Sequence, residues 1–365
     1  MLRRLYVHNF RCLENFELAI GSHPSALLIG KNGAGKSTVG SALEIFQRLA
    51  RGTNRVGDLI QPKDLTRGRL DLPVRLEIEA DISDSKYTYS LALEFHGPSK
   101  ELRVFDEILK ADGSEVYSRQ RETVELPRRK AKFELDSELI ALSLLQEKEI
   151  FQFTRWLSRM VILQPLPVLM RGESDTETLE LAKDARNFGA WFSGVLASAP
   201  AAYAEIDRYL HEVMPDFKDI QNPTVGSEAR RILVQFATPP GSLSLSFDEL
   251  SDGEKCFLLC AVVLAANRAY GPLFCFWDEP DNYLALSEVG HFIGALRREF
   301  QSKGQFITTS HHPEAIRRFS DENTFLIFRR SHLEPAVIRP LSEIPRIGDV
   351  VTAMLLGDLE HERTP

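Results

Sequence analysis

The chain is poor in cysteine, carries no excess of positive charge and has no long apolar run. Its four cysteines in 365 residues, Cys12, Cys256, Cys260 and Cys275, include no Cys-x-x-Cys pair, so neither a disulfide framework nor a cysteine metal site is expected. The net charge of −8 argues against a protein that coats nucleic acid. The longest apolar runs, such as 257–266, are far shorter than the roughly 20 residues that span a bilayer. We therefore expect a soluble cytoplasmic protein without a signal peptide or membrane partner.

Hydrophobic residues make up 43% of the chain and charged residues 26%, which is typical of a globular protein with a substantial core. Short apolar runs alternate with helical periodicity near both ends, as in an α/β protein. Between residues 72 and 126 the apolar period changes to two, which predicts an antiparallel β insertion. Residues 136–158 and 176–214 have helical periodicity.

Residues 30–37 read Gly-Lys-Asn-Gly-Ala-Gly-Lys-Ser and fit the phosphate-loop pattern G-x-x-x-x-G-K-[ST] between a predicted strand and a predicted helix. Glycines in such a loop let backbone amides face phosphate oxygens at the positive end of the helix. We expect Lys36 to reach the β- and γ-phosphates and Ser37 to bind Mg²⁺. The predicted nucleotide-binding residues of this loop are Gly30, Lys31, Asn32, Gly33, Ala34, Gly35, Lys36, Ser37 and Thr38.

The run 273–277 is continuously apolar and ends in Asp278-Glu279-Pro280. A buried parallel strand has this pattern, and ligands bind at the carboxyl ends of such strands. We therefore expect Asp278 to hold Mg²⁺ and Glu279 to polarise the attacking water.

Leu-Ser-Asp-Gly-Glu at residues 250–254 precedes an apolar helix. Ser251 and Glu254 have capping-box spacing, so one interpretation is a well-started helix. The second interpretation keeps this cap and adds an anion-binding site at the helix start. Because the phosphate loop already provides a phosphate site within the chain, this second site would serve another subunit.

These motifs, followed by Thr309-Ser-His311, resemble the ABC-type ATPase head of the SMC, RecF and OLD (overcoming-lysogenization-defect) families, specifically stand-alone bacterial ATPases with an AAA-type core. The opening Asn9-Phe-Arg11 and the insertion after the phosphate loop share the resemblance. It implies an α/β P-loop NTPase fold with an antiparallel β insertion and a helical insertion. After His311 no acidic cluster of the Toprim kind follows, so no nuclease domain is expected.

The resemblance also implies roles for individual residues. ATP is sandwiched in a homodimer, and the signature Ser251, Asp252, Gly253 and Glu254 acts in trans on the nucleotide held by the other copy. Asp252 departs from the Ser-Gly-Gly pattern. His311 matches the switch histidine, and Arg11 joins the nucleotide site. The glutamine that senses Mg²⁺ is Gln164, with Gln61 as the alternative.

Five segments follow from the motifs and the periodicity. They are the N-terminal half of the ATPase core (1–71), the antiparallel β insertion (72–135), a helical lobe with a returning core strand near 160–165 (136–240), the half with the signature, carboxylates and switch (241–345), and a C-terminal helix or tail (346–365).

The expected function is Mg²⁺-dependent ATP hydrolysis, with dimerisation as a switch in DNA repair or anti-phage defence and a separately encoded effector protein as partner. One alternative is an ATP-binding scaffold that controls a nuclease or toxin with little turnover. The other is a transporter ATP-binding subunit, which the long β insertion and Asp252 disfavour. DNA stays open as a partner: the basic run 128–132 suits phosphate contacts, although a solvated turn is the preferred interpretation.

Overall fold

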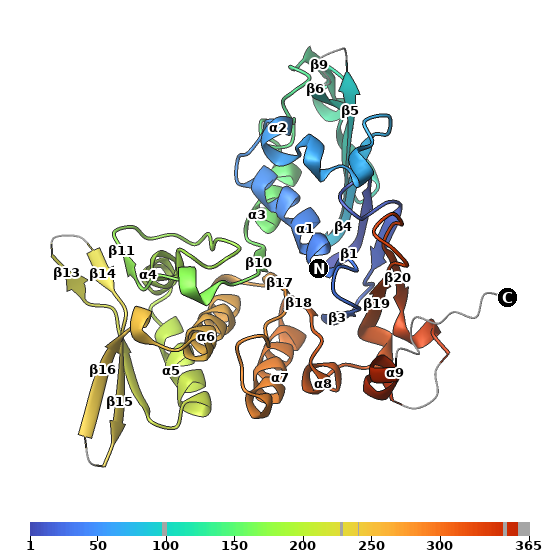
Figure 1. Cartoon of the computed structure of the whole chain (residues 1–365). Helices are drawn as coiled ribbons and strands as arrows, with labels where there is room; N and C mark the ends of the chain where they lie inside the picture. Colours follow the sequence, from blue (N-terminus) through green and yellow to red (C-terminus); the bar gives the residue numbers. More distant parts are fainter. Residues whose placement is uncertain (97–100, 227–228, 240, 346–348, 357–365) are drawn as a thin grey trace. The chain divides into compact units, whose positions relative to one another are not determined.

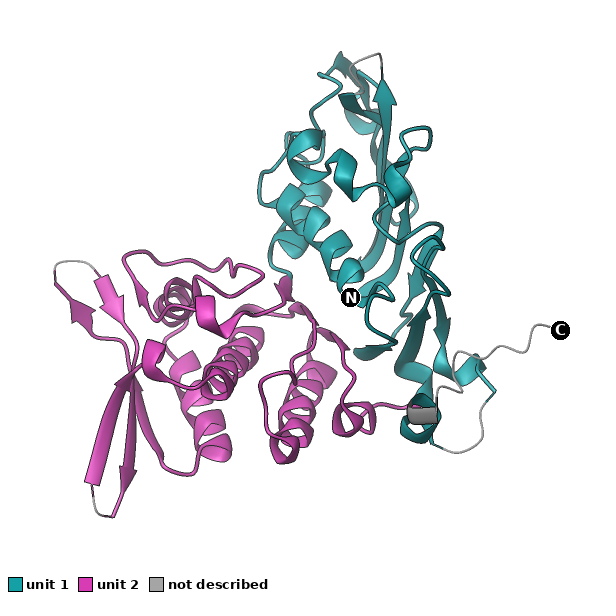
Figure 2. Ribbon diagram, in the orientation of Figure 1, with its two compact units in different colours: residues 1–160, 321–365 teal, residues 161–320 magenta. Residues whose placement is uncertain are grey.

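The computed structural model describes all residues except 97–100, 227–228, 240, 346–348 and 357–365 (Figure 1). The chain forms two compact units, one of residues 1–160 and 321–365 and one of residues 161–320 (Figure 2). The five sequence segments are stretches of chain rather than these units, and their boundaries stay a prediction. Much of the expected C-terminal tail lies outside the described residues, which there include helix α9 (Val350–Leu356).

The first unit is built on an eight-stranded antiparallel sheet. Buried positions alternate with exposed or half-buried ones along β4 (Val74–Ile82), as the period of two predicts. The sheet extends beyond the predicted insertion because the first two strands of the chain join it. In spatial order its strands are β2 (Phe16–Ala19), β1 (Leu2–His8), β4 (Val74–Ile82), β5 (Ser85–His96), β6 (Glu101–Ala111), β7 (Ser114–Gln120), β8 (Thr123–Leu126) and β9 (Ala131–Glu134).

Two helices cover one face of this sheet through aromatic contacts. Phe46 of α1 (Lys36–Ala50) meets Tyr89 edge-on, and Phe153 of α3 (Lys148–Ser158) stacks on Tyr87. The short helix α2 (Val56–Leu59) lies between them in sequence. This packing holds α1, the helix that follows the phosphate loop, against the sheet.

The same unit contains a second group of strands that carries the phosphate loop. Strand β3 (Ser25–Ile29) is wholly buried and pairs in parallel with β19 (Thr324–Phe328), whose other neighbour is the antiparallel β20 (Val337–Pro340). The loop leaves the carboxyl end of β3, which is the strand-loop-helix context that the sequence predicted.

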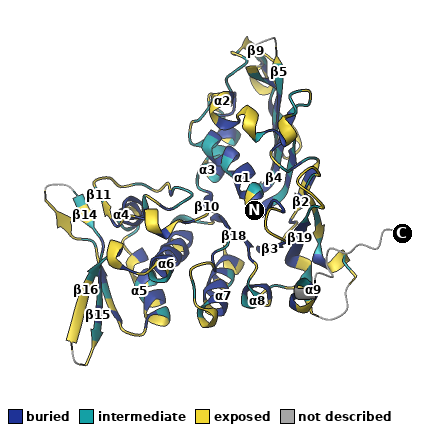
Figure 3. Ribbon diagram, in the orientation of Figure 1, coloured by how far each residue is buried: buried dark blue, intermediate teal, exposed yellow. Residues whose placement is uncertain are grey.

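The second unit packs helices around α6 (Asp252–Tyr270), which is buried from Lys255 to Asn267 (Figure 3). Its parallel strands lie in the order β10, β17, β18. The other elements of this core are α4 (Phe188–Ser198), α5 (Ala202–Val213), α7 (Leu286–Ser302), α8 (Pro313–Ile316), β10 (Val161–Leu163), β17 (Phe274–Trp277) and β18 (Gln305–Thr309).

The part of the chain expected to be a helical lobe also contains short strands. Residues 176–187 are not helical, and two small antiparallel sheets occupy much of the remainder, in the orders β11-β14-β13 and β12-β15-β16. Strands of two to six residues are too short to show a clear period of two. Their bounds are β11 (Glu173–Ser174), β12 (Phe217–Gln221), β13 (Thr224–Val225), β14 (Ala229–Arg231), β15 (Leu233–Thr238) and β16 (Gly241–Ser246).

Three of the four cysteines are core residues, and Cys12 is half-buried. Cys256, Cys260 and Cys275 are fully buried, and burial raises the pKa of the Cys256 thiol to about 12. Within the described ranges no group of three His, Cys, Asp or Glu side chains is arranged to hold a metal ion. None of the described helices combines the length and apolarity needed to cross a bilayer.

Candidate nucleotide site

The phosphate loop has the backbone that its glycines permit. Gly30, Gly33 and Gly35 have φ angles of 148°, 75° and 115°, a region that disfavours side chains. A Cβ on Gly30 would lie 2.0 Å from the carbonyl oxygen of Ile327, and one on Gly35 would lie 2.9 Å from Cys12 Sγ. Close contacts with other residues of the same unit therefore require glycine at positions 30 and 35, and the loop has this conformation without a ligand.

Lys36 is held at the centre of this loop. Its ammonium group donates hydrogen bonds to the carbonyl oxygens of Gly30 at 2.8 Å and Lys31 at 3.3 Å, and the residue is only 5% exposed. Ser37 is exposed in the first turn of α1, while Gly35 occupies the N-cap and no acidic residue lies in that turn. The amides, a cation and a hydroxyl thus meet at a helix start, which suits a phosphate ligand.

Arg11 and Gln61 lie beside the same helix. The Arg11 guanidinium donates to Asp64 at 3.1 Å and to the Ser41 hydroxyl at 3.0 Å. Gln61 begins the 3-10 helix Pro62–Asp64, and both residues line one cavity of about 260 Å³. Their roles in binding nucleotide or sensing Mg²⁺ stay predictions.

In the second unit, Asp278 and Glu279 follow directly on strand β17. Asp278 is 5% exposed and accepts a 2.7 Å hydrogen bond from the hydroxyl of Thr309, the last residue of β18. The same Thr309 hydroxyl accepts the Glu279 backbone N–H at 2.9 Å. The fully buried Thr309 thus joins the two carboxylate positions. Sequence reasoning missed this role because the bond links residues 31 positions apart.

His311 lies against the predicted catalytic carboxylate. Its Nε2 is 3.1 Å from Glu279 Oε1, and the Asn282 amide donates to Glu279 Oε2 at 2.8 Å. His312 instead accepts the Glu314 N–H at the start of α8, and the choice of His311 as the switch histidine stays a prediction. The neighbouring Asp281 is buried, and burial raises the pKa of its carboxyl.

Gln164 follows strand β10 at the same end of the parallel strands. Leu163 pairs with Trp277, and the Leu163 carbonyl accepts the Asp278 N–H at 2.8 Å. Gln164 therefore follows Leu163 just as Asp278 follows Trp277 on the adjacent strand, and the Gln164 side chain is exposed. The structure gives Gln164 the strand-end position that the sequence predicted, although its role as a magnesium sensor stays a prediction.

The signature residues start helix α6. Ser251 is the N-cap: its hydroxyl accepts the Glu254 N–H at 3.3 Å, and its own N–H and hydroxyl donate to Glu254 Oε2 at 2.7 Å. Ser251 and Asp252 are exposed. A Cβ on Gly253 would lie 3.0 Å from the Tyr283 carbonyl oxygen. The capping box is confirmed, and the exposed Ser251 leaves the role in trans open.

The basic run 128–132 carries ion pairs. Arg128 and Arg129 pair with Glu149 and Glu147 at the start of α3, and Lys132 lies 2.8 Å from Glu125. These acids neutralise much of the positive charge, which supports a solvated turn rather than a phosphate-binding patch.

The comparisons with known proteins agree with this geometry. A family of AAA domains whose description names the AbiEii toxin of a type IV toxin–antitoxin system matches residues 25–317. The chain is 49% identical over 45 residues to the OLD nuclease of Thermus scotoductus, and 32% identical over 80 residues to the chromosome partition protein Smc of Chlorobaculum tepidum. These stretches cover 12% and 22% of this chain but only 8% and 7% of those proteins.

Solved SMC heads share the fold over nearly the whole chain. An SMC head bound to the C-winged helix domain of ScpA has a TM-score of 0.59 at 15% identity and covers 94% of this chain and 98% of its own. An Smc head with an extended coiled coil, bound to the C-terminal domain of ScpA from Pyrococcus furiosus, has a TM-score of 0.57 at 13% identity, with coverage of 98% and 99%. The predicted P-loop α/β fold is thereby confirmed. The chain belongs to this family of AAA domains, and its fold is that of solved SMC heads.

Proposed function

We propose that this chain binds Mg²⁺-ATP at loop 30–37 and hydrolyses it. The observation that carries the proposal is the loop itself, which combines three glycines with positive φ and a Lys36 ammonium bonded to the Gly30 carbonyl at the start of α1. A buried cation beside an open helix start suits a polyphosphate better than a neutral ligand. Family membership supports the same ligand.

The residues proposed for Mg²⁺ fit that ion. Mg²⁺ bound with nucleotide takes one or two carboxylates plus phosphate oxygens rather than an all-protein cage. Asp278 supplies a buried carboxylate whose orientation the Thr309 hydroxyl fixes, and we propose Ser37 and Gln164 as the other protein ligands. The bound ion neutralises phosphate charge during the reaction.

Glu279 is the proposed general base. The Asn282 amide and the His311 ring lie on its two carboxylate oxygens, so its side chain is oriented before a water molecule is activated. We propose that His311 contacts the γ-phosphate. Thr309 acts as a positioning residue, because it ties the Glu279 backbone to Asp278.

The signature is proposed to act in trans. The phosphate loop supplies its own helix start to one nucleotide, so the exposed start of α6, with Ser251, Asp252, Gly253 and Glu254, suits the nucleotide of a second copy. The proposed active form is a head-to-tail homodimer with ATP at the seam. In this proposal the dimer closes when ATP is bound and opens after hydrolysis.

A switch in anti-phage defence or DNA repair is the role we infer for this cycle, with a separately encoded effector protein as the partner that reads it. The support is the family description, which names a toxin, together with the matched segments of an OLD nuclease and a chromosome partition protein. We expect this to take place in the cytoplasm, with DNA as a ligand to be tested.

The decisive experiment uses Glu279→Gln, which keeps size and hydrogen bonding but removes the base. Turnover should fall by about 100-fold or more while ATP binding persists. Light scattering with Mg²⁺-ATP should then show a dimer that returns to monomer when ADP replaces ATP. The matched control is Glu314→Gln, because Glu314 is a nearby acid that pairs with Arg317 instead.

Two results would count against the proposal. Wild-type turnover in Glu279→Gln would remove Glu279 as the base. A variant that binds ATP but stays monomeric at all protein concentrations would contradict the ATP-sandwiched dimer while leaving the nucleotide site in place.

A further inference from the structure

The sheet of β12, β15 and β16 ends in an edge strand that is open to pairing. Strand β16 pairs with β15 and, in the described part of the chain, with no other strand. Edge strands are usually blocked by lysine, proline or a bulge. Residues 241–246 read Gly-Ser-Leu-Ser-Leu-Ser, without a charge or a proline. The backbone groups on this edge are therefore accessible to an extended chain.

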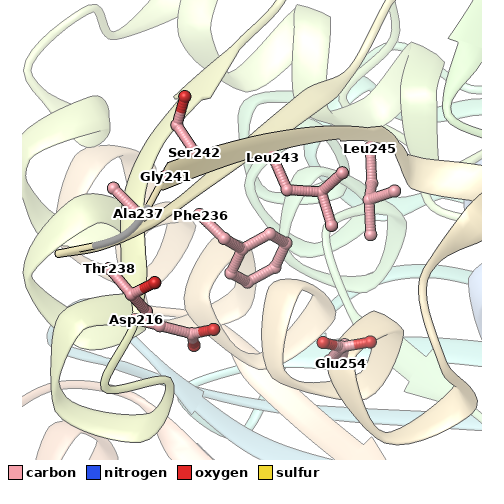
Figure 4. Close-up of a pocket in the computed structure, with 9 residues that line it drawn as sticks. All are labelled: Asp216, Phe236, Ala237, Thr238, Gly241, Ser242, Leu243, Leu245 and Glu254. Carbon is pink, nitrogen blue, oxygen red and sulfur yellow. The ribbon is translucent and has the colours of Figure 1, made fainter.

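One face of the same hairpin borders a groove. Phe236 pairs with Leu243 and Val234 with Leu245, so these apolar side chains share a face of the sheet. Val234 is fully buried, whereas Leu243 is 57% exposed because the hairpin extends beyond the helical core. A groove of about 490 Å³ lies here, and Figure 4 shows Phe236, Leu243 and Leu245 on the same side of the hairpin.

The charge of the groove identifies the kind of occupant. Asp216 and Glu254 are the charged residues that line it, and both are acidic (Figure 4). An added strand continues the alternation of the sheet, so every second side chain faces the groove. Apolar side chains there would meet Leu243 and Leu245, and lysine or arginine would meet the two carboxylates. A second copy of β16 fits less well, because it has no basic residue.

We propose that β16 is a docking edge for an extended, basic segment of another protein, which adds to the sheet as a fourth strand beside β16. Backbone hydrogen bonds to the edge supply affinity, and the groove selects the side chains. The same segment would touch Glu254, whose carboxylate caps α6 through Ser251. The docking edge is thus next to the start of the signature helix.

The test uses the full chain without nucleotide and a capped peptide in which Thr-Val-Thr-Lys occurs twice. Its valines and lysines share one face, as the groove requires. Hydrogen exchange should slow at amides within 241–246 when this peptide is added. The same peptide with glutamate in place of lysine should bind about tenfold more weakly. An unchanged exchange rate at saturating basic peptide would overturn the proposal.

Three variants separate docking from non-specific binding. Leu243→Asp should weaken peptide binding about tenfold or more, because it places a charge on the apolar face. Asp216→Asn should weaken it by about two- to fivefold, as expected for an exposed ion pair. Leu333→Asp changes another exposed leucine, 74% accessible and outside the groove, and should have no effect.

Equal losses in Leu333→Asp and Leu243→Asp would show non-specific binding and reject the docking edge. Light scattering without peptide tests whether the edge binds a second copy of the chain instead. If the chain forms a dimer in which the amides of 241–246 are protected from hydrogen exchange, and if Leu243→Asp abolishes that dimer, the edge is assigned to a second copy and the proposal is rejected. Because nucleotide is absent throughout, failure of this proposal leaves the ATPase proposal intact, and the reverse also holds.

Discussion

Two helix starts assigned to nucleotide differ in how their backbone amides are satisfied. Helix α1 begins after Gly35, with no side-chain cap and no acid in its first turn. Helix α6 begins at Ser251 with a complete capping box and two acids, Asp252 and Glu254. Both starts have the positive end of a helix dipole. Of the two, only α1 leaves that end without a side-chain cap.

The difference in capping affects how each helix start behaves when no nucleotide is bound. The α6 amides are already partly satisfied by the chain, so the helix is stable before a phosphate approaches. A phosphate arriving in trans must share Ser251 with Glu254 and overcome repulsion from Asp252. We infer that α1 determines whether nucleotide binds, and that α6 determines how readily two copies close on it.

The largest expected effect tests the α1 half of this comparison. Lys36→Ala removes the cation at the centre of the loop, and nucleotide affinity should fall by about 100-fold or more, since charged hydrogen bonds to phosphate are strong. Calorimetry with ATP measures the loss. Lys148→Ala is the matched control, because Lys148 is the exposed first residue of α3 in the same unit, and it should bind ATP normally. Retained affinity in Lys36→Ala would contradict the site.

The second effect tests whether Ser251 does more than cap. Ser251→Ala should cost about 0.5–2 kcal/mol of unfolding free energy in either case. If Ser251 also completes a partner's site, hydrolysis per folded molecule should fall at least about tenfold while ATP affinity stays unchanged. Ser246→Ala is the control, because Ser246 makes the same 2.7 Å bonds to Glu249 without belonging to the signature. Similar turnover in the two variants would assign Ser251 to capping alone.

Mixing Ser251→Ala with Lys36→Ala sharpens the same question. A head-to-tail mixed dimer has one seam with an intact loop and an intact signature, and another seam with both defects. Hydrolysis above that of either variant alone supports the arrangement. Absence of recovery, once mixed dimers are demonstrated by native mass spectrometry, would count against it.

The local motifs of this chain were readable from sequence, whereas the contacts between distant residues were not. Residues 30–37 have their geometry because glycine positions and one lysine encode it within eight residues. Thr309 could not be assigned, because its bonds to Asp278 and Glu279 depend on two strands lying side by side. The sequence Thr309-Ser-His311, in which Thr309 directly precedes the switch motif, was the available signal that Thr309 lies at the site.

The same reasoning explains the other differences. For the basic run 128–132 the sequence left phosphate contacts open beside the preferred solvated turn, because the partners Glu147 and Glu149 come later in the chain. The helices α4 and α5 are shorter than the predicted helical stretch 176–214. Apolar residues in this stretch pack into the core from irregular backbone as well as from helices, and this produced the helical periodicity. In this stretch, burial of apolar side chains in the core determines the backbone conformation more strongly than local helix propensity does.

The smallest expected effect concerns Asp252, where the two roles of the α6 start act in opposite directions. Asp252→Asn removes an acid from the first helical turn and should lower unfolding free energy by about 0.3–1 kcal/mol through the helix dipole. The same change removes repulsion toward a phosphate in trans, so ATP-dependent dimerisation in the Glu279→Gln background should strengthen by about two- to fivefold. Added salt should shrink this gain because exposed charges are screened. A variant that loses stability and also dimerises more weakly would show that Asp252 favours closure, and would reverse the contrast between the two helix starts.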